Sequence, residues 1–172
     1  MPSPIAPQAD LLKSASVLPL PTRAPERLVG VGFRCWLRGL ATGDISHWED
    51  AFNAFSAQLG PDRAKTLLIE LSQFVRAIST TAEREIEVAE PGFCGFCRDE
   101  CLAISIVAAC QHGAHPALQS SAAALLGSND IGDTIVGAQT FASGLKSANL
   151  VLALESVCPA TCAIKTQRRR PV

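Results

Sequence analysis

Three cysteines stand within eight residues near the middle of the chain, close enough in sequence to share one metal ion. Cys94, Cys97 and Cys101 belong to the segment P-G-F-C-G-F-C-R-D-E-C, in which Gly92 and Gly95 allow a tight turn. A short loop can then bring two sulfurs together, while the third enters from the first turn of the following helix. The amides and dipole at that helix start favour thiolate over thiol. Three thiolates so placed predict a zinc ion or an iron–sulfur cluster.

A fourth donor must come from elsewhere in the chain. We expect the preferred site to combine Cys158 and Cys162 with cysteines of the central cluster, so that up to five cysteines compete for four places, because the segment C-P-A-T-C can place both of its sulfurs on one side of a short helical turn. Cys35 is a further possible donor. Cys110 is predicted to be excluded, since it lies nine residues past Cys101, or about 13.5 Å along one helix. Two donors to one zinc lie only about 4 Å apart, given bonds near 2.3 Å.

Other uses of these cysteines stay open. Cys94 and Cys97 could act as a redox-active dithiol, although the strand that usually adjoins such a motif is missing. The cysteines could also be ordinary small core residues. In one unbroken helix the three central thiols would share a face, as in copper(I) sites, but Pro91 and its neighbouring glycines oppose such a helix. The spacing C-x2-C-x3-C matches neither the ferredoxin run nor the radical-SAM order.

Composition limits the function classes. The chain has 172 residues, which suits one domain, and 48% of them are apolar, which is ample for a core. Fifteen basic against sixteen acidic residues give a charge of −1, so a dedicated nucleic-acid binder is not expected. The longest clean apolar run covers residues 102–110, far short of the roughly 20 residues that a membrane span needs.

The two ends of the chain differ from the middle. Residues 1–24 contain five prolines and no secretory signal, which predicts a disordered leader. Residues 165–172 form a basic tail, most simply a solvated terminus. The odd total of seven cysteines does not suit a complete disulfide framework. We therefore expect a cytoplasmic protein with reduced thiols.

Between the ends, apolar residues recur at steps of three and four, so residues 25–164 are predicted to form a single all-α bundle of about six helices. Ser46 and Glu49 suggest a capping box for the second helix. The stripe of the third could continue through Ala82, Ile86 and Ala89. Asn129 or Asp130 is expected to cap the sixth. The helices are predicted over residues 25–43, 46–59, 61 onward, 98–111, 115–126 and 131–145, and residues 149–154 are the one candidate strand.

No catalytic motif accompanies these elements. Nucleophile-elbow and phosphate-loop spacings are absent, and Cys35, beside Arg34 and Arg38, has no general base near it in sequence. The sequence thus predicts a small non-enzymatic helical protein that holds zinc or an iron–sulfur cluster in an accessory, redox-sensing or regulatory role. It would act through a protein partner or self-association. The alternatives are a metal-free interaction module and a dithiol redox protein.

Overall fold

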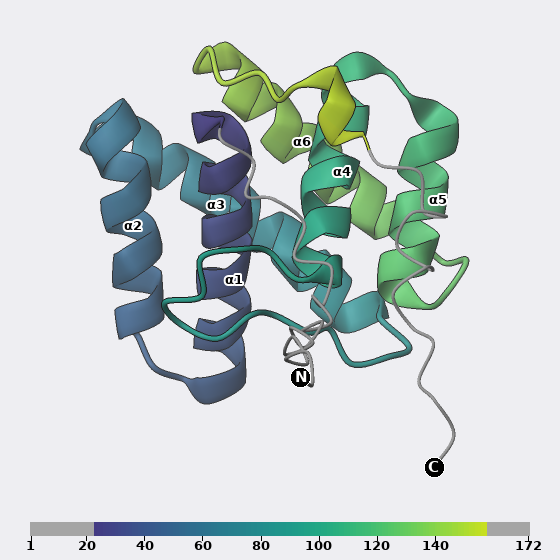
Figure 1. Ribbon diagram of the computed structural model, residues 1–172, viewed down its shortest axis with the longest axis horizontal. Coiled ribbons are helices and arrows are strands. Elements are labelled where there is room, and N and C mark those ends of the chain that lie inside the picture. Colours follow the sequence, from purple (N-terminus) through teal and green to yellow (C-terminus); the bar gives the residue numbers. More distant parts are fainter. Residues whose placement is uncertain (1–22, 158–172) are drawn as a thin grey trace, which may run out of the picture.

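The computed structural model describes residues 23–157, and this part of the chain is all-α. The predicted basic tail, Cys158, Cys162 and all but the last two residues of the predicted leader lie outside the described residues. Six helices are packed together and, between residues 23 and 157, no strand occurs (Figure 1). They are α1 (Ala24–Thr42), α2 (Ser46–Leu59), α3 (Pro61–Thr81), α4 (Arg98–His112), α5 (His115–Leu126) and α6 (Gly132–Ser147), followed by the short 3₁₀ helix η1 (Leu154–Ser156).

Helix α4 lies at the centre of the bundle. It packs against α1, α5, α6 and η1, while α3 lies along α6 and α2 bridges α1 and α3 (Figure 1). Every residue from 102 to 109 is buried. This agrees with a sequence that is apolar on all sides of the helix, because such a helix must be covered by its neighbours. No described helix is both long and apolar enough to cross a membrane.

The remaining helices bury the apolar stripes that their periodicity predicts. In α3 all seven residues of the predicted stripe are buried: Ala64, Leu67, Leu68, Leu71, Phe74, Val75 and Ile78. Phe74 contacts Phe33 of α1 and Phe141 of α6, with ring centroids 6.4 Å apart in each pair. Aromatic side chains with large buried areas thereby join three helices around one core.

Three predicted details of the helix ends are wrong. Ser46 does not cap α2; its amide instead donates to the carboxylate of Asp44 at 2.9 Å, and α2 has no side-chain cap. Helix α6 begins at Gly132, after Ile131 as its N-cap residue. Helix α3 ends at Thr81, because Ala82 turns to extended backbone (φ −65°, ψ 128°). Residues 149–153, from the candidate strand, have no regular structure before η1 begins.

Candidate metal centre

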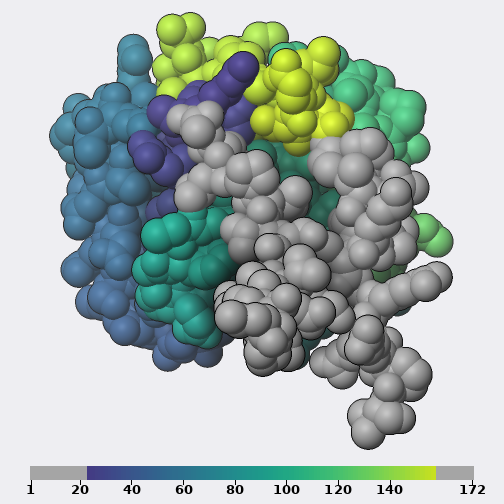
Figure 2. Space-filling model, in the orientation of Figure 1, coloured from purple at the N-terminus to yellow at the C-terminus, as the bar shows by residue number. Residues whose placement is uncertain are grey.

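The loop of residues 82–97 joins α3 to α4 and carries Cys94 and Cys97. It crosses α1 in Figure 1 and forms part of the molecular surface in Figure 2. Its first turn is tied to α5 by the Glu83 amide, which donates to the Leu126 carbonyl at 2.9 Å. Ile86 and Val88 pack partly against the core. The loop is therefore anchored along its length, although it has no regular secondary structure.

A buried ion pair between Arg34 of α1 and Glu100 of α4 holds the loop from beneath. Arg34 Nε donates to Glu100 Oε1 at 2.6 Å and Nη2 donates to Oε2 at 3.0 Å. Glu100 is fully buried and Arg34 is 8% exposed. Although Arg34 is charged, it does not lie on a solvated face of its helix. Its planar guanidinium can instead satisfy both oxygens of a carboxylate that has no access to water.

The same two side chains bind the backbone around the thiols. Arg34 donates to the carbonyls of Phe93 and Gly95, at 3.1 and 2.5 Å, and so brackets Cys94. Glu100 accepts the Cys97 amide at 2.8 Å, as the third helical residue does in a capping box. These contacts fix the backbone on both sides of Cys94 and at Cys97.

A second ion pair secures the start of the loop. Arg84 donates to both oxygens of Asp99, at 2.9 and 2.6 Å, and Asp99 also accepts the amide of Glu87 at 2.9 Å. Asp99 is buried. The two acidic residues in the first turn of α4, Asp99 and Glu100, thus both bind the loop. They also lie at the end of the helix where negative charge is favourable.

Close packing completes the support. The ring of Phe96 lies against Gly30 of α1, where a Cβ would collide with it, and the Arg34 guanidinium carbon stands 5.3 Å from the ring centroid. Only glycine at position 30 lets the ring approach the helix this closely. The aromatic ring and the cation above it add a further contact between loop and α1.

The three predicted central ligands lie in different environments. Cys94 is exposed, whereas Cys97 and Cys101 are half-buried. Each sulfur lies near a backbone carbonyl: Cys94 near Gly92 at 3.7 Å, Cys97 near Glu87 at 3.2 Å and Cys101 near Phe96 at 4.0 Å. Among residues 23–157 no three cysteine, histidine or carboxylate side chains gather as a metal site. The structure therefore brings the thiols to one loop and helix start without assembling them.

The start of α4 favours a thiolate at Cys97, but burial outweighs this effect. Burial raises the pKa of its thiol to about 11, and the charges of Glu100 and Asp99 act in the same direction. Backbone amides at the helix start do oppose this rise in pKa, as predicted, but they are outweighed. In the absence of a metal, Cys97 is a protonated thiol at neutral pH.

Cys35 and Cys110 are no better activated than Cys97. Burial raises the pKa of Cys35, and neighbouring Asp50 adds to this, while Arg34 and Arg38 only partly oppose it. Cys35 is thus not an activated nucleophile. Burial likewise raises the pKa of Cys110 to about 11.

Sequence reasoning did not identify Arg34, Arg84, Asp99 or Glu100 as supports of the site. One signal was present, since Glu100 stands three residues after Cys97, the spacing of a capping box. Nothing in the sequence pairs Glu100 with Arg34, 66 residues away. Comparison of the chain with protein families, curated proteins and solved structures gave no match.

Proposed function

We propose that this chain is a small helical protein that binds a zinc ion or an iron–sulfur cluster through Cys94, Cys97 and Cys101, with a fourth thiolate from the C-terminal segment. The observation that carries the proposal is the anchoring of the cysteine loop. Two bidentate Arg–carboxylate pairs hold a loop whose two thiols include the exposed Cys94. Such support for the backbone lowers the entropic cost of gathering ligands around a metal.

The positions of the three donors suit a small rearrangement on metal binding. The Cys101 amide donates to the Cys97 carbonyl at 3.0 Å, so these residues are one helical turn apart and share a face of α4. The thiols now lie near backbone carbonyls, and each would lose its proton when its sulfur binds a metal instead. Metal binding should therefore release protons and weaken at low pH. Rotation of the side chains, with little movement of the anchored backbone, would bring the sulfurs together.

Chain length favours Cys162 over Cys158 as the fourth donor. The Ala153 amide and the Ser156 hydroxyl donate to Glu26 of α1, at 2.6 and 2.9 Å. Glu26 precedes Arg34 by eight residues, or about 12 Å of helix. From Ser156, an extended chain spans at most about 7 Å to Cys158 and about 21 Å to Cys162. Of the two, only Cys162 is joined to Ser156 by a stretch of chain long enough to reach the cysteine loop.

The biological role that fits such a site is accessory or regulatory. Burial raises the pKa of both Cys35 and Cys97, so neither thiol is an activated nucleophile. A metal held by cysteines would instead make the local fold sensitive to metal supply and oxidation, which a protein partner or a second copy could read. The proposal assumes a reducing compartment such as the cytoplasm, where thiols stay available for metal binding.

A metal-free dithiol is the second candidate, and one observation favours it. The exposed Cys94 can meet a disulfide from solution, and the half-buried Cys97, three residues later, is placed to resolve the mixed disulfide. With oxidised glutathione, Cys94 would form a mixed disulfide and release one reduced glutathione. Cys97 would then attack it, release the second glutathione and leave a Cys94–Cys97 disulfide.

Metal analysis of the full chain tests the proposal. Anaerobic purification, an absorption spectrum and elemental analysis distinguish iron, zinc and no metal. Zinc affinity is then measured by competition with a chromophoric chelator. Single Ser replacements of Cys94, Cys97, Cys101 and Cys162 should each weaken binding at least about tenfold.

Cys110→Ser is the matched control, because it removes a thiol of the same helix that is too far away to bind. It should leave affinity unchanged. A folded protein that takes up neither zinc nor iron, even after anaerobic reconstitution, would overturn the proposal. In that case a Cys94–Cys97 disulfide, formed with oxidised glutathione and mapped by mass spectrometry, would support the dithiol function instead.

A further inference from the structure

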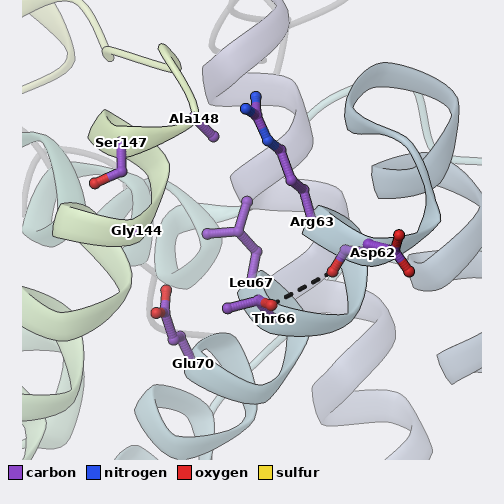
Figure 3. Close-up of a pocket in the computed structure, with 8 residues that line it drawn as sticks. All are labelled: Asp62, Arg63, Thr66, Leu67, Glu70, Gly144, Ser147 and Ala148. Atoms are coloured by element: carbon purple, nitrogen blue, oxygen red, sulfur yellow. Dashed lines mark hydrogen bonds between the residues drawn. The ribbon is translucent and has the colours of Figure 1, made fainter.

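A pocket of about 390 Å³ lies between α3 and α6, apart from the cysteine loop. Figure 3 shows the first turns of α3 on one side and the end of α6 on the other. Leu67 and Ala148 contribute apolar surface, and Glu70, Arg63 and Asp62 are its charged residues. This volume is at the small end of the range for ligand sites, about 300–1,000 Å³. The pocket therefore suits a small molecule.

The carboxylate of Glu70 is the unusual group in this pocket. Its Oε2 atom is sealed from water and makes no hydrogen bond to the residues that the structure describes. In Figure 3 the side chain extends from α3 toward α6 near Gly144. A Cβ at Gly144 would collide with Oε2, so glycine there leaves room for the carboxylate. A buried acceptor without a partner normally costs free energy, so a donor brought to this carboxylate would be stabilising.

The surroundings of Glu70 favour a positive charge. The C-terminal end of α6, which carries partial negative charge, lines the pocket with Gly144, Ser147 and Ala148, whereas the first turn of α3, of opposite polarity, lies about two helical turns before Glu70. Arg63 lies two helical turns before Glu70 and is exposed at the pocket rim. No cation of the described residues pairs with Glu70, and burial raises the pKa of its carboxyl. A bound cation would relieve this penalty.

We propose that the pocket binds a small protonated primary amine, with its ammonium group on the Glu70 carboxylate and a short apolar stem along Leu67 and Ala148. An ammonium has three donors and no acceptor, which matches an acceptor-only carboxylate. A metal ion fits less well. The hydroxyls of Thr66 and Ser147 donate to backbone carbonyls of their own helices, and the carboxylates that line the pocket are those of Glu70 and Asp62, fewer oxygens than the six to eight that calcium takes.

Three probes of the same size and different charge test this pocket. n-Butylammonium, 1-butanol and butyrate are titrated separately into ¹⁵N-labelled full-length protein, and amide shifts are followed at Gly144, Ser147 and Ala148. We expect saturable shifts for butylammonium, at least about tenfold weaker binding of butanol and none of butyrate. A charge-assisted hydrogen bond typically contributes at least one tenfold step.

Two variants separate the charge of Glu70 from the shape of the pocket. Glu70→Gln keeps the side-chain shape and should weaken butylammonium binding at least about tenfold, whereas the exposed control Glu85→Gln should leave it unchanged. Arg63→Met removes a repelling cation and should leave binding equal or tighter. Equal binding of butylammonium to the Glu70→Gln variant, equal binding of butanol, or loss of binding in Arg63→Met would each overturn the proposal, as would no saturable binding of butylammonium.

Discussion

Replacement of Arg34 by leucine tests whether the buried ion pair supports the cysteine loop. Leucine replaces the aliphatic part of the arginine side chain but removes every hydrogen bond of the guanidinium. Glu100, which is fully buried, then loses its cationic partner and keeps only the amides of Cys97 and Ala89, at 2.8 and 3.1 Å. The carbonyl of Gly95, at a buried residue, also loses its donor.

The expected cost follows from these losses. Leaving one member of a buried ion pair without its partner typically costs about 3–5 kcal/mol. The two remaining amides offset part of this, so we expect about 3–4 kcal/mol. For a domain of this size each kcal/mol lowers Tm by roughly 3–4 °C, which gives a decrease of about 10–15 °C. The loss should be seen in urea unfolding as a lower midpoint with little change in slope.

A double-mutant cycle shows whether the effect belongs to the pair. Arg34→Leu, Glu100→Leu and the double variant are unfolded in parallel, and a coupling of about 2 kcal/mol is expected between the two positions. Hydrogen exchange at the amides of Ala89 and Cys97 should accelerate in the single Arg34 variant more than exchange in α5. This second measurement reports on the loop itself rather than on overall stability.

Glu90→Gln is the control for a simple change of charge in the same loop. Its partner Arg38 lies at 3.0 Å, but the Glu90 side chain is 85% exposed. Exposed pairs contribute little, so the change should stay within about 0.5 kcal/mol. A loss below about 1 kcal/mol for Arg34→Leu, or coupling near zero with Glu100, would refute the view that this pair holds the loop.

Three further predictions concern the thiols and the packing beneath them. At pH 8, iodoacetamide should modify Cys94 before Cys97, because a thiol with a pKa of about 11 is only about 0.1% ionised there. Stability should decrease from about pH 9 to pH 11, because the thiols of Cys97 and Cys110 have an ordinary pKa of 9.0 when unfolded and one of about 11 when folded. The unfolded chain then releases its protons first, and urea midpoints should fall over this interval. Gly30→Ala should cost about 1–3 kcal/mol, because its Cβ would overlap the Phe96 ring.

Each of these has a clear opposing result. Peptide mass mapping that finds Cys97 labelled first would contradict the burial of its sulfur. Ser replacements of Cys97 and Cys110 should flatten the alkaline decrease in stability, and an unchanged slope would exclude these thiols as its cause. Gly132→Ala is the control for glycine replacement, since a Cβ there meets open space. Equal stability of the two glycine variants would show that the Phe96 contact matters little.

The helical architecture was largely predictable because its signals are local. Apolar spacing of three and four marks a buried face, proline is favourable in a first helical turn, and glycine accepts the left-handed backbone that ends a helix. Gly43, Gly113 and Gly127 end α1, α4 and α5 in this way. The burial of α4 could also be read from its composition, since it presents no polar face.

The end of α3 was not predictable from the same pattern. Ala82, Ile86 and Ala89 continue the apolar period, yet residues 82–97 form a loop. Apolar residues at helical spacing indicate which side chains prefer the core. An irregular loop can place such side chains against the core as well as a helix can. Here the backbone of the loop is bound by Asp99 and Glu100 at the start of α4, through the amides of Glu87, Ala89 and Cys97. These hydrogen bonds take the place of the backbone hydrogen bonds that a longer α3 would have made.

The sequence by itself therefore determined six amphipathic or buried helices and the closeness of three cysteines, because both depend on short spacing along the chain. Tertiary structure alone decided how those cysteines are presented. It buried Arg34 against Glu100, exposed Cys94 and raised the pKa of Cys97 to about 11. Burial and charge at a residue depend on whichever segments fold against it, and Arg34 and Glu100 are 66 residues apart in the chain.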